Sequence, residues 1–161
     1  MNILNNKRHI ITLIICLALP FLITSIATLL TSSNEVYESF NSPAFAPPSI
    51  VFPIVWTILY ILMGISSYIV HTNTTATDKQ RKKALTVYIV QLILNAIWPI
   101  IFFNLELFLL AYFLILIMIV LVIWMIYLFN NISHISAYLQ IPYLLWLGFA
   151  SILNISIYFL N

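Results

Sequence analysis

The sequence contains few charged side chains and few glycines. Asp, Glu, Lys and Arg together make up 6% of its 161 residues, whereas 63% of the residues are hydrophobic. An ordinary soluble domain is about one-quarter charged, and a chain of this length could not cover its surface in water with so few charges. The surrounding medium must therefore be lipid. The presence of just two glycines also argues against a loop-rich or β-rich fold.

Cysteine is nearly absent as well. Cys16 is the one cysteine, so a disulfide within the chain and a thiolate metal site are both excluded. The three histidines, His9, His71 and His134, match no metal-binding spacing, and we expect no metal site. The net charge of +2 is too small to indicate nucleic acid as a partner.

The sequence shows no recognisable catalytic machinery. Its long apolar runs contain no Asp, Glu, Lys or Arg, so a proton relay or an ion-coupled pump has no obvious groups. No nucleophile–base pair, phosphate-binding loop or redox pair is found. Conventional hydrolytic or phosphoryl-transfer chemistry is therefore unsupported.

Five apolar runs are long enough to cross a bilayer, which takes about 20 residues at ~1.5 Å per residue. They cover about residues 9–30, 49–70, 84–104, 107–129 and 135–160. A transmembrane barrel would need short segments of alternating polarity, and these runs do not alternate. The first run is too long for a signal peptide and lacks a convincing cleavage site, so we expect it to be retained. We predict an all-α membrane protein whose residues 1–161 form one domain, a bundle of five transmembrane helices.

The charges predict the orientation of this bundle. Five spans place every base on one side of the membrane: Lys7, Arg8, Lys79, Arg81, Lys82 and Lys83. Glu35, Glu38 and Glu106 fall on the other side, and Asp78 is the exception. The positive-inside rule then puts the amino terminus in the cytoplasm and the carboxyl terminus outside the cell membrane. The cluster DKQRKK at 78–83 can also be read as a patch for anionic lipid headgroups, although loop charge bias alone explains it.

A long connection, residues 31–48, is predicted on the outer side. It contains Tyr37, Phe40, Phe45 and three prolines. Proline fixes φ and restricts the unfolded chain, so this loop should be stiffer than its length indicates. A stiff aromatic loop at the mouth of a bundle is a candidate lid, and a simple linker is an equal alternative.

The aromatic residues divide by depth in the predicted membrane. Trp124 and Tyr127 lie near the end of a span, where interface anchors are expected. Trp56, Trp98 and Trp146 lie deeper, where lipid tails offer an indole N–H no partner. We therefore expect these three side chains to face protein or a ligand.

Three stripes at helical spacing combine aromatic, amide and small side chains. They are Trp56, Tyr60 and Met63; Gln91, Asn95, Trp98 and Phe102; and Tyr143, Trp146, Ala150, Leu153 and Asn154. Such stripes form either helix–helix contacts, in which amides and small residues lock a bundle, or the wall of an apolar pocket with a few polar groups. Spacing alone leaves both interpretations open.

Four prolines fall within the predicted spans, at Pro20, Pro53, Pro99 and Pro142. Each would remove a backbone hydrogen bond and tend to kink its helix. Kinked helices pack less tightly, so these prolines are compatible with a cavity without indicating one.

Three blocks of sequence carry a family resemblance. Residues 41–64 read NSPAFAPPSIVFPIVWTILYILMG, residues 91–103 read QLILNAIWPIIFF, and residues 142–154 read PYLLWLGFASILN. They resemble, in order and spacing, the blocks of the TspO/MBR family, also called translocator protein or tryptophan-rich sensory protein. The last two are close to the family patterns QLxLNxxWxxxFF and PYLxWxxFAxxLN. The resemblance extends over residues 37–154 and is highly specific.

The resemblance implies a compact five-helix bundle, commonly a homodimer, with a ligand pocket roofed by the loop between its first two helices. The implied ligands are porphyrin- or haem-like tetrapyrroles and other hydrophobic molecules, including isoquinoline- and benzodiazepine-type drugs; no cofactor is required. The implied ligand-binding positions are Tyr37, Phe45, Pro47, Pro48, Trp56, Tyr60, Gln91, Asn95, Trp98, Trp146, Ala150 and Leu153. This favours the pocket interpretation of the stripes.

The chain departs from the family pattern at a few positions. Val36, Ser42 and Phe45 stand where the family often has Trp, Lys and Trp, and the missing lysine removes a possible partner for a tetrapyrrole carboxylate. The tail ISIYFLN lacks the base that ends the cholesterol motif of animal members.

The function predicted from these features is that of a membrane receptor or sensor, not an enzyme. Trp56, Trp98 and Trp146 would stack on a flat macrocycle while Gln91 and Asn95 donate hydrogen bonds. One alternative is a light-dependent porphyrin-degrading enzyme with Trp56 and Trp146 as redox-active side chains. Another is a transporter of tetrapyrroles or other lipophilic molecules.

Overall fold

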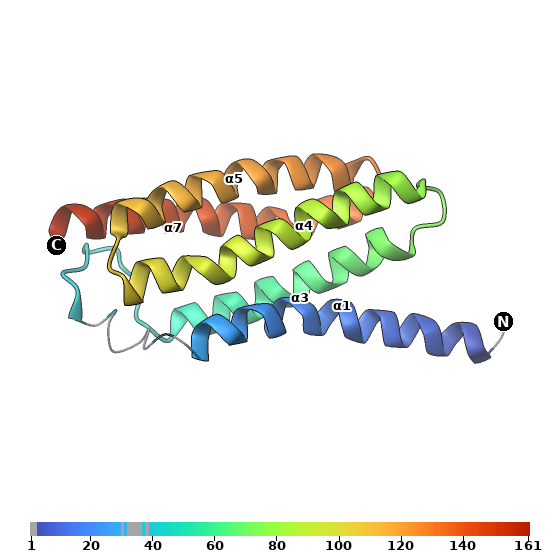
Figure 1. Ribbon diagram of the computed structural model, residues 1–161, viewed down its shortest axis with the longest axis horizontal. Helices are drawn as coiled ribbons and strands as arrows, with labels where there is room; N and C mark the ends of the chain where they lie inside the picture. Colours follow the sequence, from blue (N-terminus) through green and yellow to red (C-terminus); the bar gives the residue numbers. More distant parts are fainter. Residues whose placement is uncertain (1–2, 30, 32–36, 38) are drawn as a thin grey trace.

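The computed structural model describes residues 3–29, 31, 37 and 39–161, and every regular element in these residues is helical (Figure 1). The elements are α1 (Ile3–Leu29), α3 (Val51–Thr72), α4 (Asp78–Pro99), the π-helix η1 (Ile100–Asn104), α5 (Phe108–Asn130), α6 (His134–Tyr138) and α7 (Ile141–Leu160). Five stretches are long and apolar enough to cross a membrane: Lys7–Ile26, Val51–Thr72, Asp78–Asn104, Phe108–Asn130 and His134–Leu160. The prediction of an all-α multi-pass membrane protein with five spans is confirmed.

The basic cluster at 78–83 belongs to a helix, whereas the sequence interpretation left it in a connection. α4 begins at Asp78 because Thr77 caps it. The Thr77 hydroxyl accepts a hydrogen bond from the Gln80 N–H (3.3 Å), and the Gln80 side chain accepts one from the Thr77 N–H (2.9 Å). This reciprocal pair satisfies two backbone donors that a helix start leaves free.

Two other helices differ from the predicted spans. α1 extends back to Ile3, so Lys7 and Arg8 lie inside its first two turns rather than before it. The last predicted span is divided into α6 and α7, because the chain leaves helical geometry between Tyr138 and Ile141 and restarts with a proline at the beginning of α7. Proline suits the first turn of a helix, where backbone N–H groups have no intrahelical partner.

The bundle has two different ends (Figure 1). The first turns of α1 and α4 lie at one end, so all six Lys and Arg side chains gather there; we call it the basic end. The end of α7 and segment 39–50 lie at the opposite end. Asp78, the acid that the charge pattern left on the basic side, pairs with Arg81. Which side of the membrane each end faces stays a prediction.

The larger of the two clusters of buried apolar residues lies toward the basic end. α5 contacts α4 and α7, and α1 contacts α3 and α4. The core there includes Met63, Leu92, Val122 and Phe129, all 0% exposed. Large apolar side chains fill the space between helices in this half, as close-packed protein interiors require.

A glycine sets how closely α1 and α3 approach each other. A Cβ added at Gly64 would lie 2.8 Å from the Leu17 Cα and 2.9 Å from the Cys16 carbonyl oxygen. Real Cβ atoms do not come this close to backbone, so only glycine allows these two helices to touch here. The Cys16 carbonyl also lacks its usual helical donor, because residue i+4 is Pro20.

The four prolines act differently from one another. Pro20 lies inside α1, and Pro99 ends α4 immediately before the π-helix, so both interrupt regular hydrogen bonding as expected. Pro53 and Pro142 lie in the first turns of α3 and α7, where no intrahelical bond is lost. For these two, the expected kink is a wrong prediction.

Candidate ligand-binding cavity

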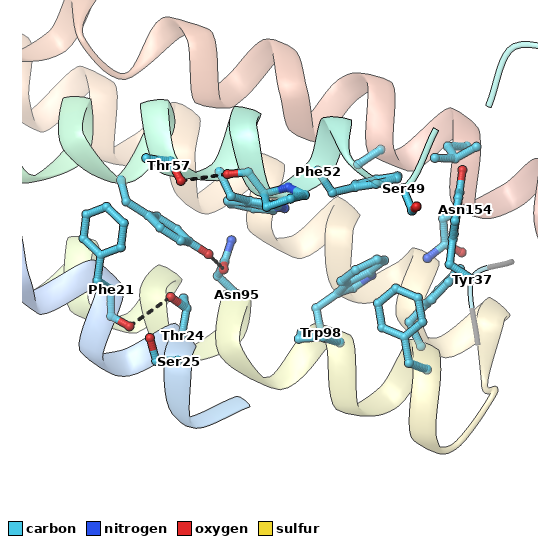
Figure 2. A pocket seen from close by; sticks show the side chains of 18 of the residues that line it. Phe21, Thr24, Ser25, Tyr37, Ser49, Phe52, Thr57, Asn95, Trp98 and Asn154 are labelled. Atoms are coloured by element: carbon cyan, nitrogen blue, oxygen red, sulfur yellow. Dashed lines mark hydrogen bonds between the residues drawn. The ribbon is translucent and has the colours of Figure 1, made fainter. Parts of the chain in front are cut away.

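A cavity of about 550 Å³ opens within the bundle, in the half opposite the basic end. Such a volume lies within the range of about 300–1,000 Å³ that is typical of small-molecule sites. The walls come from α1, α3, α4 with η1, α7 and the segment before α3 (Figure 2). The lining residues are Phe21, Thr24, Ser25, Tyr37, Ser49, Phe52, Pro53, Trp56, Thr57, Tyr60, Asn95, Trp98, Pro99, Phe102, Phe103, Ala150, Leu153, Asn154 and Ile157.

Two stacked aromatic pairs form opposite walls. On α3, Trp56 stacks on Tyr60 with ring centroids 5.2 Å apart and planes 29° apart. On the α4–η1 side, Trp98 stacks on Phe102 at 4.8 Å and 21°. Phe21 of α1 meets the edge of Tyr60 at 5.3 Å. Flat rings on facing walls suit a flat aromatic ligand.

The π-helix brings two consecutive aromatic residues to the cavity. After Pro99 the backbone switches to wider turns, in which the Leu105 N–H bonds to the Ile100 carbonyl (3.1 Å). Phe102 and Phe103 both line the cavity as a result. Single π-turns of this kind occur often at functional sites.

A short chain of hydrogen bonds lies at the inner end of the cavity. The Asn95 side-chain Nδ2–H donates to the Tyr143 hydroxyl (3.1 Å), and the Tyr60 hydroxyl donates a long hydrogen bond to the Asn95 side-chain Oδ1 (3.4 Å). Tyr143 is 0% exposed. These contacts hold the Asn95 amide in one orientation and link α3, α4 and α7 at mid-bundle.

Two polar side chains in the cavity wall have no hydrogen-bond partner among the residues that the structure describes. They are Trp98, through its indole Nε1–H, and Asn154, through both atoms of its amide. Asn154 is 1% exposed. Both side chains line the cavity (Figure 2). Buried polar groups are nearly always satisfied in proteins, so these atoms are exceptions within the cavity wall.

The segment before α3 covers the cavity end of the bundle. The Tyr37 hydroxyl donates to the Pro47 carbonyl (3.1 Å), and its ring meets the edge of Phe52 at 5.0 Å. Burial raises the pKa of the Tyr37 phenol, while a side-chain hydrogen bond with Ser42 lowers it to a smaller extent. Of the predicted loop 31–48, residues 32–36 and 38 lie outside the described residues.

The end of α7 is tied to this segment by a pair of hydrogen bonds. The Asn41 N–H donates to the Asn161 side-chain oxygen (2.9 Å), and the Asn161 amide donates to the Asn41 carbonyl (3.0 Å). The covering segment is thus tied to the end of α7, and its role as a lid or as a linker stays a prediction.

The cavity also reaches the surface of the bundle between α1 and α3. Ser25 of α1 and Thr57 of α3 both line it and are exposed. This opening lies within membrane-spanning stretches. A hydrophobic molecule could therefore pass between the bilayer and the cavity.

The structure brings seven of the twelve predicted site residues together around the cavity. These are Tyr37, Trp56, Tyr60, Asn95, Trp98, Ala150 and Leu153. The stripe residues Phe102 and Asn154 join them. The pocket interpretation of the stripes therefore agrees with the geometry.

The other five predicted residues lie elsewhere. Trp146 lies behind Trp56, with ring centroids 6.5 Å apart and planes at 83°, and borders a shallower groove on the outer side of α3 and α7. Gln91 is 0% exposed in the core, one turn from Asn95 toward the basic end. Phe45 is 50% exposed and meets the edge of Phe149.

Pro47 and Pro48 contribute backbone rather than side chains to the cover. The Pro47 carbonyl accepts the hydrogen bond from Tyr37, and the Pro48 carbonyl accepts one from the Val51 N–H (2.9 Å) at the start of α3. Neither lines the cavity. Their contribution is to position Tyr37 and the first turn of α3.

Sequence reasoning missed the wall that α1 supplies. Phe21, Thr24 and Ser25 line the cavity, yet they lie in an apolar run with no aromatic or amide stripe. For Phe52 a signal was present, because it precedes Trp56 by one helical turn on the same face.

No group of three or more His, Cys, Asp or Glu side chains capable of holding a metal ion occurs within the described ranges. His9 and His134 instead meet hydroxyl and amide groups near the basic end, those of Tyr68 (3.3 Å) and Asn130 (2.7 Å). What the cavity offers a ligand is aromatic surface with a few neutral polar groups.

Residues 12–160 match the TspO/MBR family. The chain is 36% identical to "Tryptophan-rich protein TspO" of Archaeoglobus fulgidus over 78% of its own length and 79% of that protein. It is 30% identical to the protein of the same name from Chlorobaculum tepidum, over 96% and 99% of the two lengths. It is 31% identical to "Translocator protein" of Ovis aries, over 73% and 70%.

Proposed function

This chain belongs to the TspO/MBR family, and we propose that it is an integral membrane receptor or sensor that binds porphyrin-like tetrapyrroles or other hydrophobic ligands inside the bundle. The observation that supports the proposal most directly is the cavity of about 550 Å³ between two stacked aromatic pairs. A flat, apolar ligand would lie between the Trp56 and Trp98 walls, and its polar groups would meet Asn95 and Asn154.

The ligand would reach the cavity from the membrane. Hydrophobic molecules concentrate in the bilayer, and among the cavity-lining residues Ser25 of α1 and Thr57 of α3 are exposed within membrane-spanning stretches. With the basic end in the cytoplasm, as the positive-inside rule requires, the cavity would lie in the outer half of the cell membrane. Tyr37 and the segment that it anchors would then form the cover on the outer face.

Filling the cavity tests this proposal. We expect Ala150→Phe to place a ring in the space and to weaken binding of protoporphyrin IX at least about tenfold, since overfilled sites lose the ligand's contact area. The matched control is Ile152→Phe on the same helix, where the side chain is 58% exposed on the outer surface. Binding would be measured by the shift of the porphyrin absorption band in nanodiscs, with thermal unfolding to verify folding. Equal affinities in the two variants would reject the cavity as the site.

The arrangement of Trp56 and Trp146 supports a second candidate, light-dependent porphyrin breakdown. Trp56 lines the cavity, and Trp146 contacts it edge-on from behind, so an oxidised Trp56 would have a second indole as its neighbour. Illumination of the porphyrin complex separates the candidates. With a receptor, the bound porphyrin bleaches no faster than free porphyrin under the same light, whereas an enzyme bleaches it faster in wild type and not in Trp56→Phe.

Two further parts of the proposal have direct measurements. Transport of the tetrapyrrole instead of its recognition would appear as ligand flux into liposomes carrying wild type but not Ala150→Phe.

A homodimer, as the family resemblance implies, would appear as twice the mass of the 161-residue chain in native mass spectrometry from nanodiscs. A single-chain mass would reject it.

A further inference from the structure

The start of α4 carries three lysines whose charge no acid neutralises. Asp78 pairs with Arg81, so this acid and this base compensate each other. Within the described part of the chain, no acid forms an ion pair with Lys79, Lys82 or Lys83. All three lysine side chains are exposed. Their positive charge is therefore open to a partner outside this chain.

The three lysines continue the outward-facing stripe of α4. An α-helix turns by about 100° per residue, so Lys79, Lys82 and Lys83 share one helix face with residues further along the span Asp78–Asn104. The exposed residues on that face are Thr86, Val90, Ile93 and Ile97. The lipid-facing surface of α4 thus passes directly into positive charge, where acyl chains give way to headgroups.

Aromatic residues of the neighbouring helix mark the same depth. The Lys83 Nζ lies 5.6 Å from the centre of the Trp124 ring on α5, a cation–π contact. Trp124 is 44% exposed, and Tyr127, one turn nearer the basic end, is 63% exposed. Trp and Tyr side chains gather where acyl chains meet headgroups. Since α4 and α5 pack against each other (Figure 1), the lysines and these two rings border one surface.

The orientation of the bundle does not by itself explain this surface. Loop charge bias requires bases on one side of the membrane, but it does not specify the helix face that carries them. Lys7 and Arg8 of α1 already supply bases at the same end. The lysines of α4 instead stand on the face that meets lipid and beside an interfacial tryptophan. The phosphate of a phospholipid is the countercharge nearest to such a face.

From these observations we infer that the surface between the start of α4 and the end of α5 binds an anionic phospholipid. Lys79, Lys82 and Lys83 contact its headgroup, and its acyl chains lie along the apolar part of the α4 stripe. A lysine near an anionic membrane surface contributes roughly a fivefold preference, so three lysines select anionic over zwitterionic lipid. The site lies at the end opposite the cavity and does not depend on the proposed function.

Native mass spectrometry of the full chain in detergent tests the inference. Phosphatidylglycerol and phosphatidylcholine with identical acyl chains would be titrated separately, and the lipid retained on the protein measured. We expect phosphatidylglycerol to bind at least about twentyfold more tightly, the combined contribution of two or more lysines. Equal affinities for the two lipids would overturn the inference.

Two double variants remove the same amount of charge from the same end of the bundle. Lys79→Gln/Lys83→Gln should reduce the preference for phosphatidylglycerol to about fivefold or less, the contribution of Lys82 alone. Lys7→Gln/Arg8→Gln on α1 is the matched control and should leave the preference unchanged. If the two variants lower the preference equally, the attraction comes from the net charge of the basic end, and a site on α4 is rejected.

A third variant separates charge from folding. Lys79→Arg/Lys83→Arg keeps both charges and should keep the preference for phosphatidylglycerol, while thermal unfolding in the same detergent verifies that each variant is folded. Loss of the preference in this variant would show that charge is not what binds the lipid. Millimolar inorganic phosphate tests the source of the anion. Displacement of phosphatidylglycerol by it would mean that a soluble anion is the ligand, contrary to the inference.

Fluorescence quenching tests the position of the lipid in a bilayer. Phosphatidylglycerol with brominated acyl chains should quench the wild type more strongly than brominated phosphatidylcholine at the same mole fraction. The excess should disappear in Trp124→Phe, because the other three tryptophans border the cavity or the outer groove. An excess that persists in Trp124→Phe would place the bound lipid elsewhere on the bundle.

Discussion

Along α3, α4 and α7, the half of the bundle toward the basic end is filled, whereas the same helices enclose a cavity in the other half. Met63, Leu92 and Leu147 are 0–2% exposed in the filled half. About one turn further along each helix, Tyr60, Asn95 and Ala150 border the cavity. Side-chain hydrophobicity therefore does not separate the two halves; the fit between neighbouring side chains does.

Two features explain the difference in packing. In the filled half, flexible Met and branched Leu and Val side chains interlock, as at Met63, Leu92 and Val122. In the other half, Trp and Phe rings stack on their own helix neighbours, as Trp56 does on Tyr60, and leave the space between walls open. A void with rigid aromatic walls can persist because its rings have few alternative rotamers with which to fill it.

The largest effect should come from truncating one leucine in each half. Leu92→Ala leaves a hole in the filled half, where Leu92 is 0% exposed, and should lower the free energy of unfolding by about 2–5 kcal/mol. Leu153→Ala enlarges an existing cavity and loses fewer contacts. This variant should therefore lower the free energy of unfolding by roughly half as much as Leu92→Ala, or less. Thermal and denaturant unfolding in one detergent would measure both. Similar losses would mean that the cavity half is as tightly packed as the basic half.

The crossing of α1 and α3 provides the second test, since it marks the boundary between the halves. Gly64→Ala pushes a methyl group against the Leu17 and Cys16 backbone and should destabilise the protein by about 1–3 kcal/mol. At Gly148 an added Cβ meets nothing within 4 Å, so Gly148→Ala should be neutral or slightly stabilising through its better helix propensity. Equal melting temperatures for the two variants would contradict the close approach.

The ends of the bundle also differ, because the basic end is organised by local bonds. Thr77→Ala removes the α4 cap and should lower stability by about 1 kcal/mol. Ser133 occupies the corresponding position before α6 without a side-chain cap bond, so Ser133→Ala should change little. Hydrogen exchange at residues 78–81 would locate the effect, and unchanged exchange there in Thr77→Ala would show that the cap is dispensable.

The cavity end is held by a long-range pair, and here we expect the smallest change in stability. Asn161→Ala removes its exposed hydrogen bonds to Asn41 and should lower stability by less than about 1 kcal/mol. Its effect should appear instead as faster ligand dissociation, because the covering segment loses an anchor. Ser156→Ala is the control, since that hydroxyl bonds within its own helix to Ile152. Identical dissociation rates for the two variants would rule out the anchor.

Much of the candidate site was readable from the sequence where a stripe mixed aromatic and amide residues. The sequence placed two residue pairs on the correct helix faces: Trp56 with Tyr60, and Asn95 with Trp98. Lipid tails offer a polar or indole group in a span no hydrogen-bond partner, so such groups are expected to face the protein. Trp146 shows the limit of this reasoning: it packs edge-on behind Trp56 and borders the outer groove instead of lining the cavity. Helical spacing therefore predicts that a side chain faces the protein interior, but it does not distinguish a buried side chain from one that lines the cavity.

The contribution of α1 and the helix boundaries could not be read in this way. The α1 run is apolar on nearly every face, so nothing in its periodicity indicates that Phe21 and Thr24 would point inward. The break between α6 and α7 and the π-turn after Pro99 depend on backbone geometry that one proline signals only in part. Gln91 has an amide like that of Asn95, yet lies in the filled core.

Composition and length alone determined that five helices cross a lipid bilayer with all bases at one end, because apolar runs of this length have no other stable environment and charged residues cannot remain within it. Tertiary structure alone decided where those helices fill space and where they leave it. That outcome depends on how α1 is rotated and how closely it approaches α3 at Gly64, and on whether each ring stacks on its own helix or reaches the next one. These are properties of pairs of helices, which no single run of residues contains.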